Sequence, residues 1–165
     1  MSDPQIQRGE TPATREVIRH LEALGIPFER LEHPPVATSQ AAADARGSRL
    51  AEGAKALTIK AGDSYHHLII SAAQRVDNQK LRRILGTRRI RFATAAELRD
   101  LTGCLPGAVP PFGNLFGLPV LMDDALLAEE TVFFNCASHT ISLRMRRADM
   151  VTATEARVVD FHLEE

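Results

Sequence analysis

The sequence has few cysteines and no long apolar segment. Its two cysteines, Cys104 and Cys136, form neither a C-x-x-C pair nor a secreted-type disulfide pattern, so we expect a reducing compartment and leave a thiol role in the site open. The N-terminal residues lack the apolar core of a signal peptide, and no run of residues reaches the length of a membrane span. These absences predict a cytoplasmic protein that does not contact a membrane.

The sequence also has almost no net charge and lacks the common catalytic motifs. A net charge of −1 over 165 residues excludes a strongly basic coat for nucleic acid, so any RNA contact must be local. The chain has no G-x-S-x-G, Walker or G-x-G-x-x-G motif, which removes the usual signatures of serine hydrolases, nucleotidases and dehydrogenases. His66 and His67 are adjacent and so point to opposite faces of a strand. With no other cluster at metal-ligand spacing, we predict no metal site and no cofactor.

A segment rich in glycine and proline, residues 103–113 (GCLPGAVPPFG), is the most distinctive feature present. It cannot form a regular helix or an inner strand, because proline removes amide donors and glycine is favoured where other residues are strained. Prolines stiffen such a loop, and glycines let another molecule approach its backbone. The segment therefore suits the binding of an oxyanion or a water, and a purely structural connector is the alternative.

Hydrophobic periodicity and turn signals predict one α+β domain over residues 14–165, preceded by a flexible arm of residues 1–13. We take Thr14 as the N-cap of the first helix, Asp77 as the N-cap of a helix that ends at Leu85, and Thr94 as the start of a capping box. Further helices are expected at 39–46 and 147–152, and strands at 27–32, 54–61, 65–72, 88–93, 118–122, 131–135, 140–145 and 156–161.

Lys55 lies in the predicted strand 54–61. Alternation places it on the same face as Leu57 and Ile59, whereas Lys60 falls on the other face. A lysine that turns inward is costly unless its ammonium finds an anion or reaches the rim. The position indicates a cation in a pocket, and a lysine that extends to solvent at the strand end is the alternative.

A basic stretch at residues 80–91 has six positive side chains and no acidic one. It predicts a patch that contacts the phosphates of a nucleic acid. A solvated basic helix surface without a ligand is the alternative. The residues assigned to this phosphate contact are Lys80, Arg82, Arg83 and Arg88.

Together with GAKALTIK (residues 53–60) and FFNCASHTISL (residues 133–143), the loop resembles the YbaK/ProX family. These are free-standing relatives of the editing domain inserted in bacterial prolyl-tRNA synthetase, and they hydrolyse wrongly charged aminoacyl-tRNAs. The resemblance extends from about residue 14 to residue 161. It implies an α+β fold with a mixed, partly closed, barrel-like sheet flanked by helices, in which the lysine strand and the loop meet at one pocket.

The resemblance also implies a trans-editing deacylase that needs no covalent nucleophile, because an aminoacyl ester is already activated. Its substrate would be tRNA carrying alanine, serine or threonine, with cysteine open, and the 2′-hydroxyl of the tRNA would assist. Lys55, Gly103, Pro106 and Gly107 are the expected catalytic residues. The expected substrate-binding residues are Pro110, Pro111, Phe112, Gly113, Asn135, Ser138 and His139, although a purely structural role remains open for His139.

Two other functions remain open at this point. One is a catalytically inactive module of the same fold that binds tRNA or a synthetase, and the other is a small-molecule ester hydrolase or amino-acid sensor. The expected partner is the acceptor end of mischarged tRNA, with an aminoacyl-tRNA synthetase as a further candidate. The chain is expected to act as a monomer.

Overall fold

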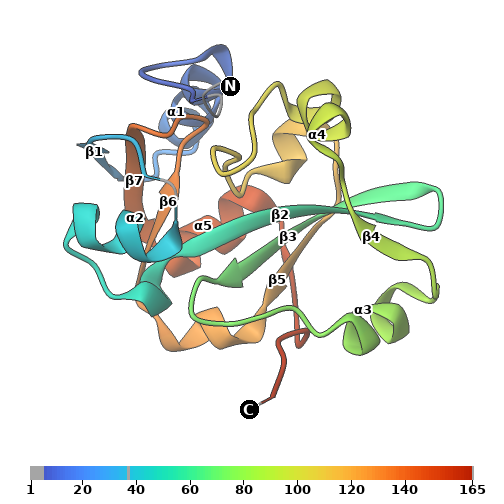
Figure 1. Ribbon diagram of the computed structural model, residues 1–165. Helices are drawn as coiled ribbons and strands as arrows, with labels where there is room; N and C mark the ends of the chain where they lie inside the picture. The colour runs from blue at the N-terminus through green and yellow to red at the C-terminus, as the bar shows by residue number, and fades with distance from the viewer. Residues whose placement is uncertain (1–5, 37, 165) are drawn as a thin grey trace.

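The computed structural model describes residues 6–36 and 38–164, which form an α+β fold (Figure 1). Helices and strands follow one another without strict alternation. The helices are α1 (Pro12–Ala23), α2 (Ser39–Arg46), α3 (Asn78–Leu85), α4 (Ala95–Thr102) and α5 (Arg147–Thr154), with 3-10 turns at Leu50–Glu52, Gly113–Phe116 and Asp124–Ala128. The strands are β1 (Glu29–Glu32), β2 (Ala54–Ala61), β3 (Ser64–Ser71), β4 (Ile90–Phe92), β5 (Val120–Asp123), β6 (Thr131–Asn135), β7 (Ile141–Arg146) and β8 (Arg157–Val159).

The strands form two sheets. The larger has the order β4-β2-β3-β5-β8, with antiparallel pairs from β4 to β3 and parallel pairs from β3 to β8. The smaller sheet, β1-β7-β6, is antiparallel, and an isolated parallel bridge between Gly53 and Phe133 connects it to the larger one. The predicted α+β class with mixed strands is confirmed, and the sheets do not close into a full barrel.

The core divides between the two faces of the larger sheet. Ile59 and Leu68 pack with Leu81 of α3 on one face. On the other face, Ala54 and Ile69 belong to a cluster that also holds residues of the smaller sheet and of α1. This division follows from strand geometry, since successive side chains along β2 and β3 point to opposite faces and both faces are covered.

Of the three helix caps predicted from the sequence, two are confirmed and one is wrong. Asp77 and Thr94 cap α3 and α4 as predicted, and Thr94 forms a capping box with Glu97. The prediction that Thr14 caps the first helix is wrong, because the cap is Thr11 and the helix begins at Pro12. Thr14 instead occupies the third helical position, where its buried hydroxyl donates to the carbonyl of Cys136 at 2.7 Å.

The segment before α1 contacts the rest of the fold. Of the predicted arm, residues 1–5 lie outside the described residues. Gln7 exchanges two hydrogen bonds with His139, from Gln7 N to Nδ1 at 2.9 Å and from His139 N to the Gln7 carbonyl at 2.7 Å. The side-chain oxygen of Gln7 also accepts from Leu105 N at 3.0 Å. Residue 7 is thus hydrogen-bonded both to the β6–β7 turn and to the loop 103–113.

None of the helices in the described ranges combines the length and the apolar character that a membrane crossing needs.

Candidate active-site pocket

A cavity of about 300 Å³ lies where four segments meet. α2 and the first residues of β2 form one part of its lining, and the end of β6 and the loop 103–113 form the other. Figure 1 shows α2 beside the N-terminal end of β2, where β6 and β7 also approach. The volume is at the lower end of the range for small-molecule sites, so the cavity suits a small ligand group.

Three of the predicted site residues line this cavity, namely Lys55, Gly107 and Asn135. They come from β2, the loop and β6, which are far apart in the sequence. The lysine strand and the loop therefore meet at one pocket, as the family resemblance implies. The other predicted residues of the loop and the β6–β7 turn do not line it: Gly103, Pro106, Pro110, Pro111, Phe112, Gly113, Ser138 and His139.

Lys55 is exposed, so the prediction that it turns inward is wrong in this respect. Its strand parity is as predicted, since Leu57 and Ile59 share one cluster whereas Ala54 belongs to the other. The edge strand β4 pairs with β2 only from Ile59 onward, which leaves the lysine at an open edge of the sheet. The ammonium therefore lies at the solvent side of the cavity.

Side chains of β3, β6 and the β6–β7 turn bind carbonyl groups of the loop. His139 Nε2 donates to the carbonyl of Pro106 at 3.0 Å, and Asn135 Nδ2 donates to that of Gly107 at 2.6 Å. The third bond joins His67 Nε2 to the carbonyl of Pro110 at 2.9 Å. A carbonyl only accepts, so both histidines carry a proton on Nε2, and the bond from Gln7 N to His139 Nδ1 agrees with this tautomer.

His67 also explains why residue 113 is glycine. The imidazole is fully buried, and Thr58 Oγ1 lies 3.1 Å from its Nδ1. A Cβ atom on Gly113 would lie 2.4 Å from the Cβ of His67, so no other residue fits without movement of the backbone. Burial lowers the pKa of His67 to about 4, which keeps the ring neutral at physiological pH.

Anchoring of the carbonyls leaves backbone amides for a ligand. Ala108 N donates to the carbonyl of Leu105 at 3.0 Å, whereas the amides of Gly107 and Val109 have no acceptor among the residues that the structure describes. Both Gly107 and Val109 line the cavity, and Gly107 has φ of +85°, which glycine adopts without strain. Backbone amides without an acceptor in the wall of a cavity are candidates to bind a carbonyl oxygen or an oxyanion.

Arg46 is a cavity residue that the sequence did not indicate. It is half-buried at the end of α2, and its Nη2 donates to Asn135 Oδ1 at 2.8 Å while its Nε donates to Ser142 Oγ at 2.9 Å. Burial lowers the pKa of Arg46 to about 10, so the side chain remains protonated at neutral pH. The hydrogen bond from Asn135 to Gly107 links this guanidinium to the loop.

Ser138 and His139 have structural partners in place of a ligand. Both are buried, and the Ser138 hydroxyl donates to the Gln7 carbonyl at 3.2 Å. Each ring nitrogen of His139 is hydrogen-bonded, to Gln7 and to Pro106. Their contacts hold the segment around Gln7, the loop and the β6–β7 turn together.

Both cysteines are buried. Cys104 packs in a small apolar cluster with Leu98 and Val109, and Cys136 belongs to the cluster that holds residues of the smaller sheet and α1. Burial raises the pKa of Cys104 to about 11 and that of Cys136 to about 12. A thiolate is the nucleophilic form, so neither thiol is suited to attack an ester at neutral pH. This argues against the thiol role that the sequence left open.

The basic stretch is divided in the structure. Arg82, Arg83 and Arg88 line a second hollow of about 470 Å³. Figure 1 shows α3 near the opposite end of β2 from α2, so this hollow and the cavity lie at different ends of the larger sheet. Lys80 does not line it and instead forms ion pairs with Asp160 and Glu164 at 2.8 and 3.0 Å.

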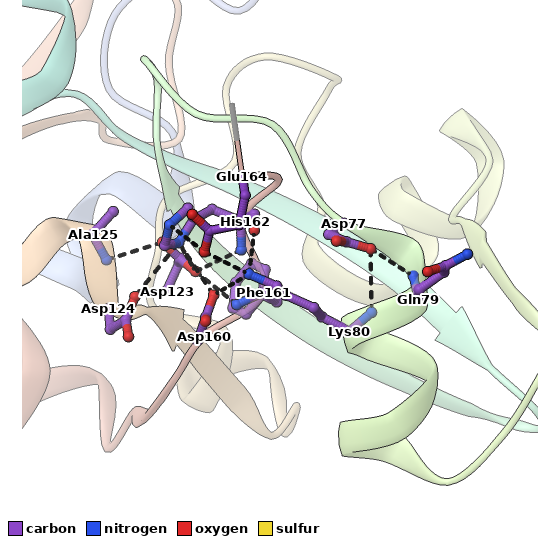
Figure 2. A network of polar contacts seen from close by, with 10 residues as sticks. All are labelled: Asp77, Gln79, Lys80, Asp123, Asp124, Ala125, Asp160, Phe161, His162 and Glu164. Atoms are coloured by element: carbon purple, nitrogen blue, oxygen red, sulfur yellow. Dashed lines mark hydrogen bonds and ion pairs between the residues drawn. The ribbon is translucent and has the colours of Figure 1, made fainter.

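An acidic cluster lies beside the Lys80 ammonium (Figure 2). Asp123, Asp124, Asp160 and His162 each offer one potential metal ligand within 4.8 Å of the others. The fully buried Asp123 already accepts from the amides of Ala125, Phe161 and His162. With these acceptors occupied and an ammonium at its edge, the cluster joins the C-terminal segment to β5 and α3.

Comparison with known proteins places the chain in a family. Residues 33–153, which include every residue discussed as lining the cavity, match the family described as "Aminoacyl-tRNA editing domain". The chain belongs to this family. The resemblance predicted from the sequence is thereby confirmed.

Several relatives resemble this editing domain over much of its length. It is 32% identical to the Multifunctional Ser/Thr-tRNA deacylase ProXp-y of Escherichia coli (strain K12), over 89% of this chain and 91% of that protein. It is also 32% identical to a Proline--tRNA ligase of Staphylococcus aureus (strain Newman), over 52% of this chain and 15% of the ligase. A solved structure described as a candidate trans-editing enzyme for prolyl tRNA synthetase matches with a TM-score of 0.85 and 28% identity, over 94% of this chain and all of that one.

Proposed function

We propose that this editing domain is an aminoacyl-tRNA deacylase that hydrolyses, in trans, the ester of tRNA mischarged with alanine, serine or threonine, with cysteine as a further candidate. The observation that carries the proposal is the meeting of Lys55 with the anchored loop, through Gly107 and Val109, in one small cavity. The name of the Escherichia coli relative, a Ser/Thr-tRNA deacylase, supports the serine and threonine choice.

In the proposed reaction, the amides of Gly107 and Val109 bind the carbonyl oxygen of the ester and stabilise the oxyanion that forms on it. A water attacks the carbonyl carbon, the bond to the ribose oxygen breaks, and that oxygen takes a proton and leaves as the 3′-hydroxyl. The neighbouring 2′-hydroxyl assists the proton transfer. Lys55, at the solvent side, anchors the terminal phosphate or polarises the ester.

The size of the cavity supports a small amino acid. A synthetase gains only about 1–3 kcal/mol of discrimination per methylene, so small or isosteric amino acids are the ones that need later hydrolysis.

The Arg82, Arg83 and Arg88 surface is proposed to contact tRNA phosphates away from the cavity. A synthetase is a further candidate partner, and we propose a monomer as the active form.

The decisive measurement is release of amino acid from a panel of tRNAs charged with alanine, serine, threonine, cysteine and a large amino acid. We expect the wild type to deacylate at least one of the small ones and Lys55→Ala to lose about 10²–10³ in rate. Lys60→Ala is the matched control, since it removes a lysine from the same strand but from the opposite face, and it should leave the rate unchanged.

Two results would contradict the proposal. Binding of tRNA without release of any amino acid would favour the inactive module. Hydrolysis of simple amino-acid esters at the same rate as charged tRNA would favour the small-molecule esterase.

A further inference from the structure

Arg46 holds an uncompensated charge in the cavity wall. Its hydrogen-bond acceptors, Asn135 Oδ1 and Ser142 Oγ, are both neutral. Within the described part of the chain, no carboxylate lies at ion-pair distance from this guanidinium, and desolvation is the cause of its lowered pKa. A half-buried charge without a counter-ion is costly, so an anionic ligand would relieve it.

The cavity as a whole is positive. Among the described residues that line it, Arg46 and Lys55 are charged and none is acidic, although the entire chain has a net charge of −1. The two cations differ in depth, because Lys55 is exposed and Arg46 is half-buried. The cavity wall therefore favours an anion over a cation.

The guanidinium is also fixed in orientation. Nε and Nη2 are engaged by Ser142 and Asn135, and Nη1 makes no hydrogen bond to any residue that the structure describes. A planar guanidinium held along one edge presents its remaining donors in a set direction, and this geometry suits the oxygens of a phosphate.

We propose that Arg46 forms an anion subsite that binds a phosphate oxygen at the 3′ end of the substrate RNA. The proposal rests on the deacylase function above. The proposed aminoacyl groups have neutral side chains and an α-ammonium, which Arg46 repels, and the ester itself is neutral. Phosphates are thus the anionic groups that such a substrate offers.

The test compares three substrates with the same amino acid: charged tRNA, 2′(3′)-O-aminoacyl adenosine 5′-monophosphate, and 2′(3′)-O-aminoacyl adenosine without phosphate. For Arg46→Gln we expect KM to rise about 10- to 100-fold on the two phosphate-bearing substrates, as for loss of a hydrogen bond to a charged group. On the nucleoside ester, KM and kcat should stay unchanged, since that substrate lacks the phosphate.

Arg49→Gln is the matched control. Arg49 lies three residues further along the chain, is paired with Glu129 and does not line the cavity. It should leave KM unchanged on all three substrates. An equal rise in KM or fall in kcat for Arg46→Gln on all three substrates would overturn the proposal, because it would show that the arginine acts through Asn135 and the loop. Unchanged kinetics on all three substrates would also overturn it.

A binding measurement separates this proposal from the proposed function. Calorimetric titration with adenosine 5′-monophosphate should show weaker binding to Arg46→Gln than to the wild type, and adenosine should bind both proteins equally. Equal binding of the monophosphate to both proteins would overturn the subsite even if deacylation is confirmed. Wild-type failure on all three esters would refute the deacylase, while the titration would still decide the phosphate contact.

Discussion

His67 shows how a single buried side chain couples the fold to pH. Its ring is enclosed by β2, the loop and Gly113, and only the neutral form is compatible with burial. The folded-state pKa of about 4 lies below the ordinary value of 6.5. Between these values the unfolded chain binds more protons, so the free energy of unfolding falls as the pH falls from about 6.5 to 4 and this contribution is fully present above 6.5.

We therefore expect His67→Gln to reduce the pH dependence of stability, by on the order of 3 kcal/mol between pH 7 and pH 4. Glutamine keeps an N–H that can reach the Pro110 carbonyl but does not titrate. Urea unfolding at several pH values would measure the effect. The control is His66→Gln. His66 is half-buried on the other face of β3, so its replacement should remove a smaller part of the pH dependence of the free energy of unfolding. Identical pH profiles for His67→Gln and the wild type would refute this explanation.

At the scale of elements, the loop 103–113 depends on close contact with β3. The Cβ of an alanine at position 113 would overlap the Cβ of His67, so one of the two backbone segments must shift. Gly113→Ala should destabilise the protein by about 1–3 kcal/mol through overpacking and should lower kcat, because the loop moves. Thermal unfolding and deacylation would measure the two effects.

The matched test for this contact is a double-mutant cycle. In a His67→Gly background, which removes the opposing Cβ together with the ring, Gly113→Ala should cost less than in the wild type. Additive costs would show that the two residues do not interact.

Local signals predicted most elements, whereas the supports of the site could not be predicted. Caps such as Asp77 and Thr94 act within a few residues, so the sequence displays them directly. The hydrogen bonds of Arg46 to Asn135, Gln7 to Leu105 and His67 to Pro110 span 89, 98 and 43 residues. A sequence pattern carries no signal for such pairs before the fold is known.

Lys55 and Ser138 show the same limit within the predicted site. Strand alternation gave the face of Lys55 correctly, but its exposure depends on where β4 stops pairing with β2. Ser138 has the small hydroxyl expected of a recognition residue, yet this hydroxyl donates its hydrogen bond to the carbonyl of Gln7. In both cases a distant segment decides what a local pattern leaves open.

At the scale of the whole molecule, the basic surface and the cavity lie at opposite ends of the larger sheet. If Arg82, Arg83 and Arg88 bind tRNA phosphates, replacing all three by glutamine should raise KM for charged tRNA without changing kcat. The slope of log KM against log salt concentration should fall by about one unit or less for each phosphate that the variant no longer neutralises.

Lys80→Gln should act differently from that triple variant. Its ammonium joins Asp160 and Glu164, so we expect lower stability of the C-terminal segment with an unchanged salt slope. A salt slope that stays at the wild-type value in the triple variant would exclude this surface as the tRNA-binding surface.

Side chains of β3, β6 and the β6–β7 turn hold the carbonyls of Pro110, Gly107 and Pro106, so the backbone of the loop 103–113 is fixed before any ligand binds. A rigid loop does not close around a bound acyl group, and it does not change its conformation to accommodate a larger one. We therefore expect the cavity to discriminate between aminoacyl groups by steric exclusion, without an induced-fit step. Crystal structures of the free and the ligand-bound protein should show the same backbone conformation at residues 106–110.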